Sequence, residues 1–120
     1  MGKRILVVDD DAMNLRMAEF ILSKQEYEVL KVASGQECLD TLASQAVDLV
    51  LLDIEMPVMN GIQTLENIRS NAVCADIPVM FLTAADEAEV KPDADRLNVI
   101  AIIKKPFMPP VLLETVAKAF

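Results

Sequence analysis

Short apolar runs and amphipathic segments alternate along this chain. Most runs hold four or five consecutive aliphatic residues, which is typical of strands buried on both faces of a parallel sheet. We expect strands at residues 5–8, 28–33, 49–52, 79–82 and 99–103. In most of the segments that follow these strands, apolar residues recur every three or four positions, as they do on the buried face of a helix.

Residues that favour helix starts mark the beginning of four of the expected helices. Asp10 and Asp11 precede the first, and either carboxylate can accept the free N–H groups of a first turn. The S-x-x-E sequence at residues 34–37 is a capping box before the second helix. Asn60 opens the third, and the prolines at 109–110 suit the first turn of the last.

The segment from residue 86 to residue 97 has the weakest helical pattern. It is acidic, its apolar spacing is poor, and it contains Pro92. A proline inside a helix removes one hydrogen bond and clashes with the preceding turn, at a cost of about 3 kcal/mol. We therefore expect a shorter fourth helix with Pro92 near its first turn.

Strand and helix patterns thus alternate five times with short links, which predicts an α/β fold. Right-handed crossovers between successive strands place helices on both faces of a parallel sheet. We predict a doubly wound five-stranded parallel sheet in the flavodoxin-like order 2-1-3-4-5, with five flanking helices. In this order the first and third strands are neighbours, and ligands bind where the strand order reverses.

Length and charge narrow the functional classes. The chain has 120 residues, 53% of them hydrophobic, which fits one compact domain over residues 1–120. Its net charge of −8 disfavours direct contact with nucleic acid or with an anionic membrane surface. No apolar run reaches membrane length and no signal-peptide pattern precedes the first strand, so we expect a cytoplasmic protein.

The absence of histidine excludes several chemistries. A Ser-His or Cys-His nucleophile and an imidazole-ligated metal are not available to this chain. Cys38 and Cys74 are too few for a disulfide framework or a zinc site, so we expect buried, reduced thiols.

Three carboxylates are expected to meet at one edge of the sheet. Asp9 and Asp10 follow the first strand, and Asp53 ends the third. Thr83 and Lys105 follow the fourth and fifth strands at the same edge. Because three carboxylates without a cation would repel one another, we predict that they hold Mg²⁺, which prefers oxygen ligands.

This combination of side chains predicts a site of phosphoryl transfer. Asp53 would be the nucleophile and would form an aspartyl-phosphate. Lys105 can pair with a carboxylate or a phosphoryl oxygen, and Thr83 offers a hydroxyl beside the small Ala84. Two simpler interpretations stay open at this point. Asp53 could merely end a buried strand, and the acidic triplet at 9–11 could only cap the first helix.

Four short motifs resemble those of the receiver domain of bacterial two-component response regulators. They are LVVDD at residues 6–10, LLDIEMPVMNG at 51–61, FLTA at 81–84 and KPF at 105–107. Their order and spacing match this family over essentially the whole chain. The resemblance makes a single receiver domain the expected content of residues 1–120.

The resemblance implies a role for each acidic residue. Asp53 would be the phosphorylated residue. Asp10, Asp53 and the backbone carbonyl of Glu55 would bind Mg²⁺ directly, and Asp9 would act mainly through a coordinated water.

The resemblance also implies how the phosphoryl group is sensed. Lys105 would bind a phosphoryl oxygen, and its bond to Pro106 would be cis. Thr83 would turn inward to hydrogen-bond the phosphoryl group and so pass the signal on. The aromatic residue that usually moves with the threonine is replaced here by Ile102, and the usual glycine before the fifth strand by Asn98, which also tolerates the left-handed region.

A receiver domain implies partners rather than a substrate. The phosphoryl donor would be a histidine kinase or a histidine phosphotransfer protein. Because this chain has no histidine, the donor must be another protein or a small acyl phosphate. The domain would be a switch that promotes its own phosphorylation and dephosphorylation, not an enzyme. It would act on an output domain or effector protein through the face of the fourth helix, fifth strand and fifth helix.

Two other functions are weighed against this one. A phosphatase of haloacid-dehalogenase type favours an acid two residues after its nucleophile, and Glu55 comes near that pattern. Such enzymes need additional cap and core segments, for which 120 residues leave little room. A degenerate receiver that only binds partners is disfavoured because every acidic-site position is present.

The fifth strand is apolar on both faces, where the family usually shows charge and an aromatic residue. Ile100 and Ile102 share one face, and a short fourth helix around Pro92 would leave them partly covered. We predict a hydrophobic interface there, for a second copy of the chain or an output domain. The alternative is that a fourth helix bending around Pro92 buries both isoleucines.

Overall fold

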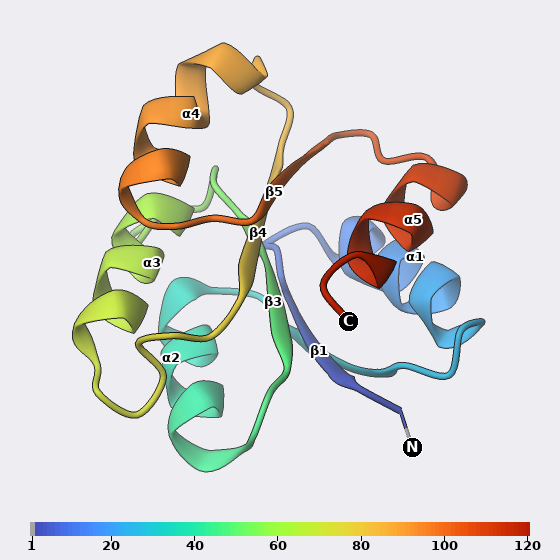
Figure 1. Cartoon of the computed structure of the whole chain (residues 1–120), viewed down its shortest axis with the longest axis horizontal. Helices are drawn as coiled ribbons and strands as arrows, with labels where there is room; N and C mark the ends of the chain where they lie inside the picture. Colours follow the sequence, from blue (N-terminus) through green and yellow to red (C-terminus); the bar gives the residue numbers. More distant parts are fainter. Residues whose placement is uncertain (1) are drawn as a thin grey trace.

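The computed structural model, which describes residues 2–120, is a parallel five-stranded sheet between two layers of helices (Figure 1). Its strands are β1 (Arg4–Val8), β2 (Glu28–Val32), β3 (Leu49–Asp53), β4 (Val79–Thr83) and β5 (Ala101–Lys104). They lie in the order β2-β1-β3-β4-β5, and every neighbouring pair is parallel. The predicted fold class and strand order are confirmed.

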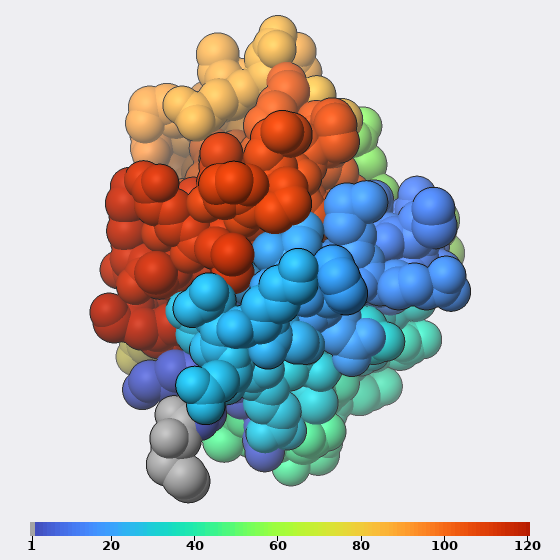
Figure 2. Space-filling view, turned by 90° about the vertical axis from the view of Figure 1, so that its right-hand side faces the viewer, coloured from blue at the N-terminus to red at the C-terminus, as the bar shows by residue number. Residues whose placement is uncertain are grey.

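Five helices cover the two faces of the sheet. They are α1 (Ala12–Ser23), α2 (Gly35–Ser44), α3 (Gly61–Ser70), α4 (Glu87–Arg96) and α5 (Pro109–Ala117). Helices α2, α3 and α4 lie on one face, and α1 and α5 lie on the other (Figure 1). Figure 2 looks onto this second face, where α1 and α5 lie side by side. Over the described residues, no helix combines the length and apolarity needed to cross a bilayer.

The core consists of two apolar clusters, one on each side of the sheet. Leu52 and Phe81 pack under α2, α3 and α4, whereas Leu51 and Leu82 pack under α1 and α5. Every residue of β3 and β4 is buried, which explains why these strands read as unbroken apolar runs. The two cysteines are buried free thiols, as expected.

The helix starts follow the predicted caps only in part. Asp11, not Asp10, caps α1, and its Oδ1 accepts the N–H of Met13 at 2.8 Å. At α2, the Ser34 hydroxyl accepts the N–H of Glu37 at 3.1 Å. The Glu37 carboxylate accepts the N–H of Ala33 rather than that of Ser34, so half of the predicted capping box is formed.

Helix α3 begins with a capping box that was not predicted. Asn60 accepts the N–H of Gln63 at 2.8 Å, and the Gln63 side chain accepts the N–H of Asn60 at 3.0 Å. Gly61 follows directly, and a Cβ atom there would collide with the carbonyl oxygen of Asp53. Glycine thus lets the start of α3 approach the end of β3.

The prediction for the fourth helix was wrong, because α4 runs from Glu87 to Arg96 with Pro92 in its interior. Val90, Ala94 and Leu97 are buried against the core at helical spacing, which requires the helix to continue across the proline. Burial of a valine or leucine stabilises a fold by about 1.5–3 kcal/mol. Val90 and Leu97 together therefore offset the roughly 3 kcal/mol that an interior proline costs.

The fifth strand begins two residues later than predicted and extends one residue further. The N–H of Val99 donates to the carbonyl of Ala94 in α4, so Val99 stays outside the ladder. Asn98 has a φ of 58°, which agrees with the left-handed conformation expected there. Ile100 precedes β5 and is 52% exposed, whereas Ile102 is partly buried against the core. Of the predicted apolar strip, only Ile100 is therefore well exposed.

Candidate functional site

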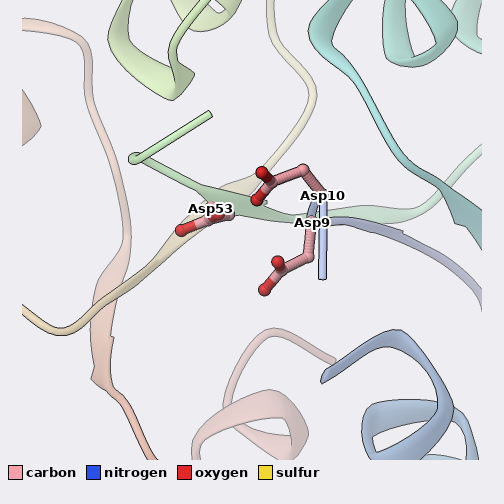
Figure 3. Close-up of side chains that lie close together, drawn as sticks. All are labelled: Asp9, Asp10 and Asp53. Carbon is pink, nitrogen blue, oxygen red and sulfur yellow. The ribbon is translucent and has the colours of Figure 1, made fainter. Parts of the chain in front are cut away.

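Three aspartates meet where β1 and β3 end (Figure 3). Val8 and Leu52 are partners in the β1–β3 ladder, so Asp9 and Asp53 follow as neighbours. One carboxylate oxygen from each of Asp9, Asp10 and Asp53 lies within 4.8 Å of the other two. Asp9 and Asp53 are buried and Asp10 is exposed. The juxtaposition predicted from the strand order is present.

Lys105 neutralises part of this cluster. Its Nζ lies 2.7 Å from Oδ2 of Asp9 and 2.9 Å from Oδ1 of Asp53. The lysine follows β5, and its peptide bond to Pro106 is cis, as the family resemblance implied. One ammonium against three carboxylates leaves the cluster with an excess of negative charge when all are ionised.

Backbone and amide donors fix the two buried carboxylates. Asp9 Oδ1 accepts the N–H of Asp11 at 2.9 Å, and its Oδ2 accepts the Asn14 side chain at 3.2 Å. Asp53 Oδ1 accepts the N–H of Glu55 at 3.3 Å. Lys105 binds the same oxygen, and no hydrogen bond reaches Oδ2 of Asp53 from residues 2–120. Asn14 was not predicted from the sequence, although a polar residue in the first turn of α1 was a usable signal.

The environment of Asp53 changes its protonation. Burial raises the pKa of its carboxyl from 3.8 to about 6. The hydrogen bond and charge of Lys105 and the hydrogen bond from Glu55 lower this pKa, whereas the charge of Asp9 raises it. Burial lowers the pKa of Lys105, but its hydrogen bonds and charge interactions with Asp9 and Asp53 outweigh this and raise it above the ordinary value.

Thr83 ends β4, between the acidic cluster and β5. Its side chain is buried, and its hydroxyl oxygen accepts the N–H of Ala85 at 2.9 Å. Its carbonyl accepts the N–H of Lys105 at 2.8 Å, which links the ends of β4 and β5. Ile102 is paired with Phe81 in the β4–β5 ladder. Thr83 thus lies at the same edge of the sheet as the cluster and Ile102 lies further back along β5, while their roles as switch residues stay a prediction.

The donor set fits a hard divalent cation. Three carboxylates within reach of one another offer the oxygen ligands that Mg²⁺ prefers, and an exposed Asp10 leaves room for coordinated water. The loop that carries Glu55 begins directly after Asp53. Imidazole and thiolate ligands are not part of the cluster, which disfavours zinc or copper.

We expect the Asp10→Asn variant to respond less to Mg²⁺ than the wild type. A ligand that binds only the native state raises the melting temperature, and loss of one carboxylate should weaken Mg²⁺ binding by about tenfold or more. The same change should stabilise the metal-free protein, because it relieves repulsion. Melting curves over a Mg²⁺ titration measure both effects.

Asp11→Asn is the matched control for this experiment. Asparagine caps helices as well as aspartate does, and Asp11 lies outside the three-carboxylate cluster. It should therefore keep the wild-type response to Mg²⁺. Equal Mg²⁺ responses of Asp10→Asn and wild type would show that Asp10 is not a metal ligand.

Comparisons with known proteins agree with this geometry. Residues 5–117 match the family model of the response regulator receiver domain. The polar-differentiation response regulator DivK of Brucella ovis is 29% identical over 119 residues, which are 97% of this chain and 94% of DivK. The transcriptional regulatory protein PhoP of Bacillus subtilis is 31% identical over 109 residues. The match spans 91% of this chain but only 45% of PhoP.

Solved structures show the same relationship. The chemotaxis protein CheY4 of Vibrio cholerae superimposes with a TM-score of 0.94 over the full length of both chains, at 28% identity. A CheY-like receiver domain protein of Methanospirillum hungatei gives a TM-score of 0.89 at 30% identity, over 98% of this chain. The family match, the fold and the acidic cluster agree, and the chain belongs to the response regulator receiver domain family.

Proposed function

We propose that this chain is a phospho-accepting switch of a two-component phosphorelay and that Asp53 accepts the phosphoryl group. One observation carries the proposal. The buried carboxylate of Asp53 has one oxygen held by Lys105 and Glu55, and the carboxylate lies beside those of Asp9 and Asp10. A positioned carboxylate with an adjacent ammonium and a cation site is suited to phosphoryl transfer, which depends mainly on positioning and charge neutralisation.

The transfer itself needs no general base. Oδ2 of Asp53 would attack the phosphorus of a partner's phosphohistidine, and the P–N bond would break as the P–O bond forms. The imidazole leaves with the electron pair of that bond and takes a proton from solvent. The product is an acyl phosphate on Asp53. A small acyl phosphate could donate in the same way, with its carboxylate as leaving group.

The side chains around Asp53 have distinct roles in this proposal. Asp10, Asp53 and the carbonyl of Glu55 would hold Mg²⁺ directly, and Asp9 would do so through water. Bound Mg²⁺ would supply positive charge against the phosphoryl oxygens. Lys105 would exchange its contact with Asp53 Oδ1 for one with a phosphoryl oxygen.

Signal transmission would begin at Thr83. Its hydroxyl would reorient to donate a hydrogen bond to the phosphoryl group, and Ile102 would follow as a smaller relay than an aromatic ring. The affected surface would be the face of α4, β5 and α5, where Ile100 is exposed. An output domain, an effector protein or a second copy of the chain is the proposed partner there, and a histidine kinase or histidine phosphotransfer protein is the proposed donor.

The geometry favours this role over a phosphatase of haloacid-dehalogenase type. Such an enzyme would need the side chain of Glu55 beside its nucleophile. Glu55 is exposed, and the contact that it makes with Asp53 is through its backbone N–H. A degenerate binding module is equally disfavoured, because the three carboxylates and Lys105 are assembled.

Incubation with acetyl phosphate and Mg²⁺ should add one phosphoryl group to the wild type and none to Asp53→Asn. Intact-protein mass spectrometry measures the addition, and hydroxylamine should remove it because the product is an acyl phosphate. Asp40→Asn, a substitution of an exposed carboxylate on α2, should be modified like the wild type. Equal modification of Asp53→Asn and wild type would refute the assignment.

A further inference from the structure

A lysine outside the acidic cluster holds the loop that connects β4 to α4. Lys104 is the last residue of β5 and the ladder partner of Thr83. Its Nζ lies 3.1 Å from the carbonyl oxygen of Ala85 and 3.5 Å from Oδ1 of Asp86. The end of β5 and the β4–α4 loop lie side by side in Figure 1.

Ala85 is therefore held from both sides. Its N–H donates to the hydroxyl oxygen of Thr83 at 2.9 Å, while its carbonyl accepts from Lys104. A reorientation of the Thr83 hydroxyl toward a phosphoryl group on Asp53 has two possible consequences. It breaks the bond to the Ala85 N–H, or it carries Ala85 along and strains the contact with Lys104. In the first case Lys104 becomes the remaining one of these two contacts on Ala85, and in the second its contact is strained, so in both cases Lys104 opposes departure of the loop from this arrangement.

The position of Asp86 supports the same conclusion. Asp86 is the N-cap residue of α4, yet its side chain makes no capping hydrogen bond. At the corresponding position of α1, the side chain of Asp11 does cap its helix. The Asp86 carboxylate faces Lys104 instead, and so the lysine competes with the free N–H groups of α4 for it. Release from Lys104 would free the Asp86 carboxylate to accept the N–H groups of α4, which would offset part of the contact that is lost.

We propose that Lys104 is a positioning residue that holds the β4–α4 loop in its unphosphorylated arrangement and thereby weakens the response of Thr83 to phosphorylation. The proposal rests on the function proposed above, because it assumes that Thr83 moves toward a phosphoryl group on Asp53. Contacts that form in only one of two states shift the equilibrium toward that state. Removing Lys104 should therefore favour the phosphorylated state.

The charge of Lys104 by itself predicts the opposite effect of its removal on the affinity for a phosphoryl analogue. Lys104 is a cation next to Lys105 in sequence and close to a site that would bind an anion. If only its charge mattered, its removal would weaken the binding of a phosphoryl analogue. An increase in affinity is therefore diagnostic of the loop contacts.

The test is titration of the Mg²⁺-loaded protein with beryllofluoride, a phosphoryl analogue, by isothermal titration calorimetry. Lys104→Met should bind it about two- to fivefold more tightly than the wild type, the range expected for loss of exposed charged contacts. Lys104→Arg keeps N–H donors at this position and should return the affinity to the wild-type value. The affinity for Mg²⁺ without beryllofluoride should be the same in all three proteins. A general structural disturbance of the site would change that affinity as well.

Lys91→Met is the matched control. It also removes one exposed, ion-paired lysine, but Lys91 pairs with Asp95 on α4 and not with the loop. Its affinity for beryllofluoride should not rise. Unchanged or weaker binding by Lys104→Met, with normal binding by wild type, would overturn the role of Lys104 alone. A wild-type protein that binds no beryllofluoride would overturn this proposal and the proposed function together.

Discussion

Replacement of Lys105 by methionine should destabilise the Mg²⁺-free protein by about 3–5 kcal/mol at pH 8. The ammonium of Lys105 contacts the buried carboxylates of Asp9 and Asp53 at 2.7 and 2.9 Å. Methionine fills similar space but leaves both charges without a cation in a site that water hardly reaches. Breaking a buried pair from one side costs more than the pair contributes, since the remaining charge is uncompensated.

The loss should depend on pH in a defined direction. The folded pKa of Asp53 is about 6, above its ordinary value of 3.8. A carboxyl whose pKa is higher in the folded protein than in the unfolded one stabilises the fold at low pH. This stabilisation is complete below the unfolded pKa and is lost as the pH rises through the folded pKa. Without Lys105 that folded pKa rises further. The free energy of unfolding of the variant should therefore be closer to that of the wild type at pH 5 than at pH 8.

Urea unfolding of wild type and Lys105→Met at pH 5 and pH 8, with chelator present, measures this difference. Lys118→Met is the control, since Lys118 forms an exposed pair with Glu114 at 3.9 Å, and pairs of this kind contribute little. Addition of Mg²⁺ at pH 8 should return part of the lost stability. An equal loss at both pH values would mean that packing of the lysine stem, rather than its charge, explains the effect.

The Arg69→Met variant should be about 2–4 kcal/mol less stable than wild type, with a melting temperature roughly 10 °C lower. The guanidinium of Arg69 donates to four backbone carbonyls in two separate segments. The acceptors and their distances are Leu97 at 2.9 Å, Asn98 at 3.4 Å, Ala75 at 3.0 Å and Ile77 at 2.6 Å. Removal of the donor takes a partner from these carbonyls, three of which make their contact in a partly buried place, and disconnects the end of α4 from α3.

Arg96→Met is the appropriate comparison for Arg69. Arg96 pairs with Glu66 and Asp93 on the exposed surface, where such contacts contribute little to stability. Thermal and urea unfolding should therefore separate the two variants clearly. If Arg69→Met is no less stable than Arg96→Met, the prediction is wrong. Water would then replace Arg69 as the partner of the four carbonyls without a loss of stability.

Much of this protein follows from local sequence patterns. Unbroken apolar runs predicted most of the strands, because residues buried on both faces of a parallel sheet have no polar alternation. The alternation of strands and helices, together with right-handed crossovers, predicted a doubly wound parallel sheet, and 2-1-3-4-5 is one of the common strand orders of such sheets. In that order β1 and β3 are neighbours, so Asp9 and Asp53 at their ends lie close together. The acidic cluster could therefore be predicted from the sequence. The cis bond of Pro106 was predictable only through the family resemblance.

Only the tertiary structure decided the remaining features. Helix α4 continues across Pro92 because Val90 and Leu97 gain more from burial in the core than the proline costs, which no local propensity expresses. No sequence pattern singled out Arg69 or Lys104. Arg69 and Lys104 both donate to backbone carbonyls, which every residue carries and which therefore leave no pattern in the sequence. Such contacts exist only once the fold has brought distant segments within hydrogen-bonding distance.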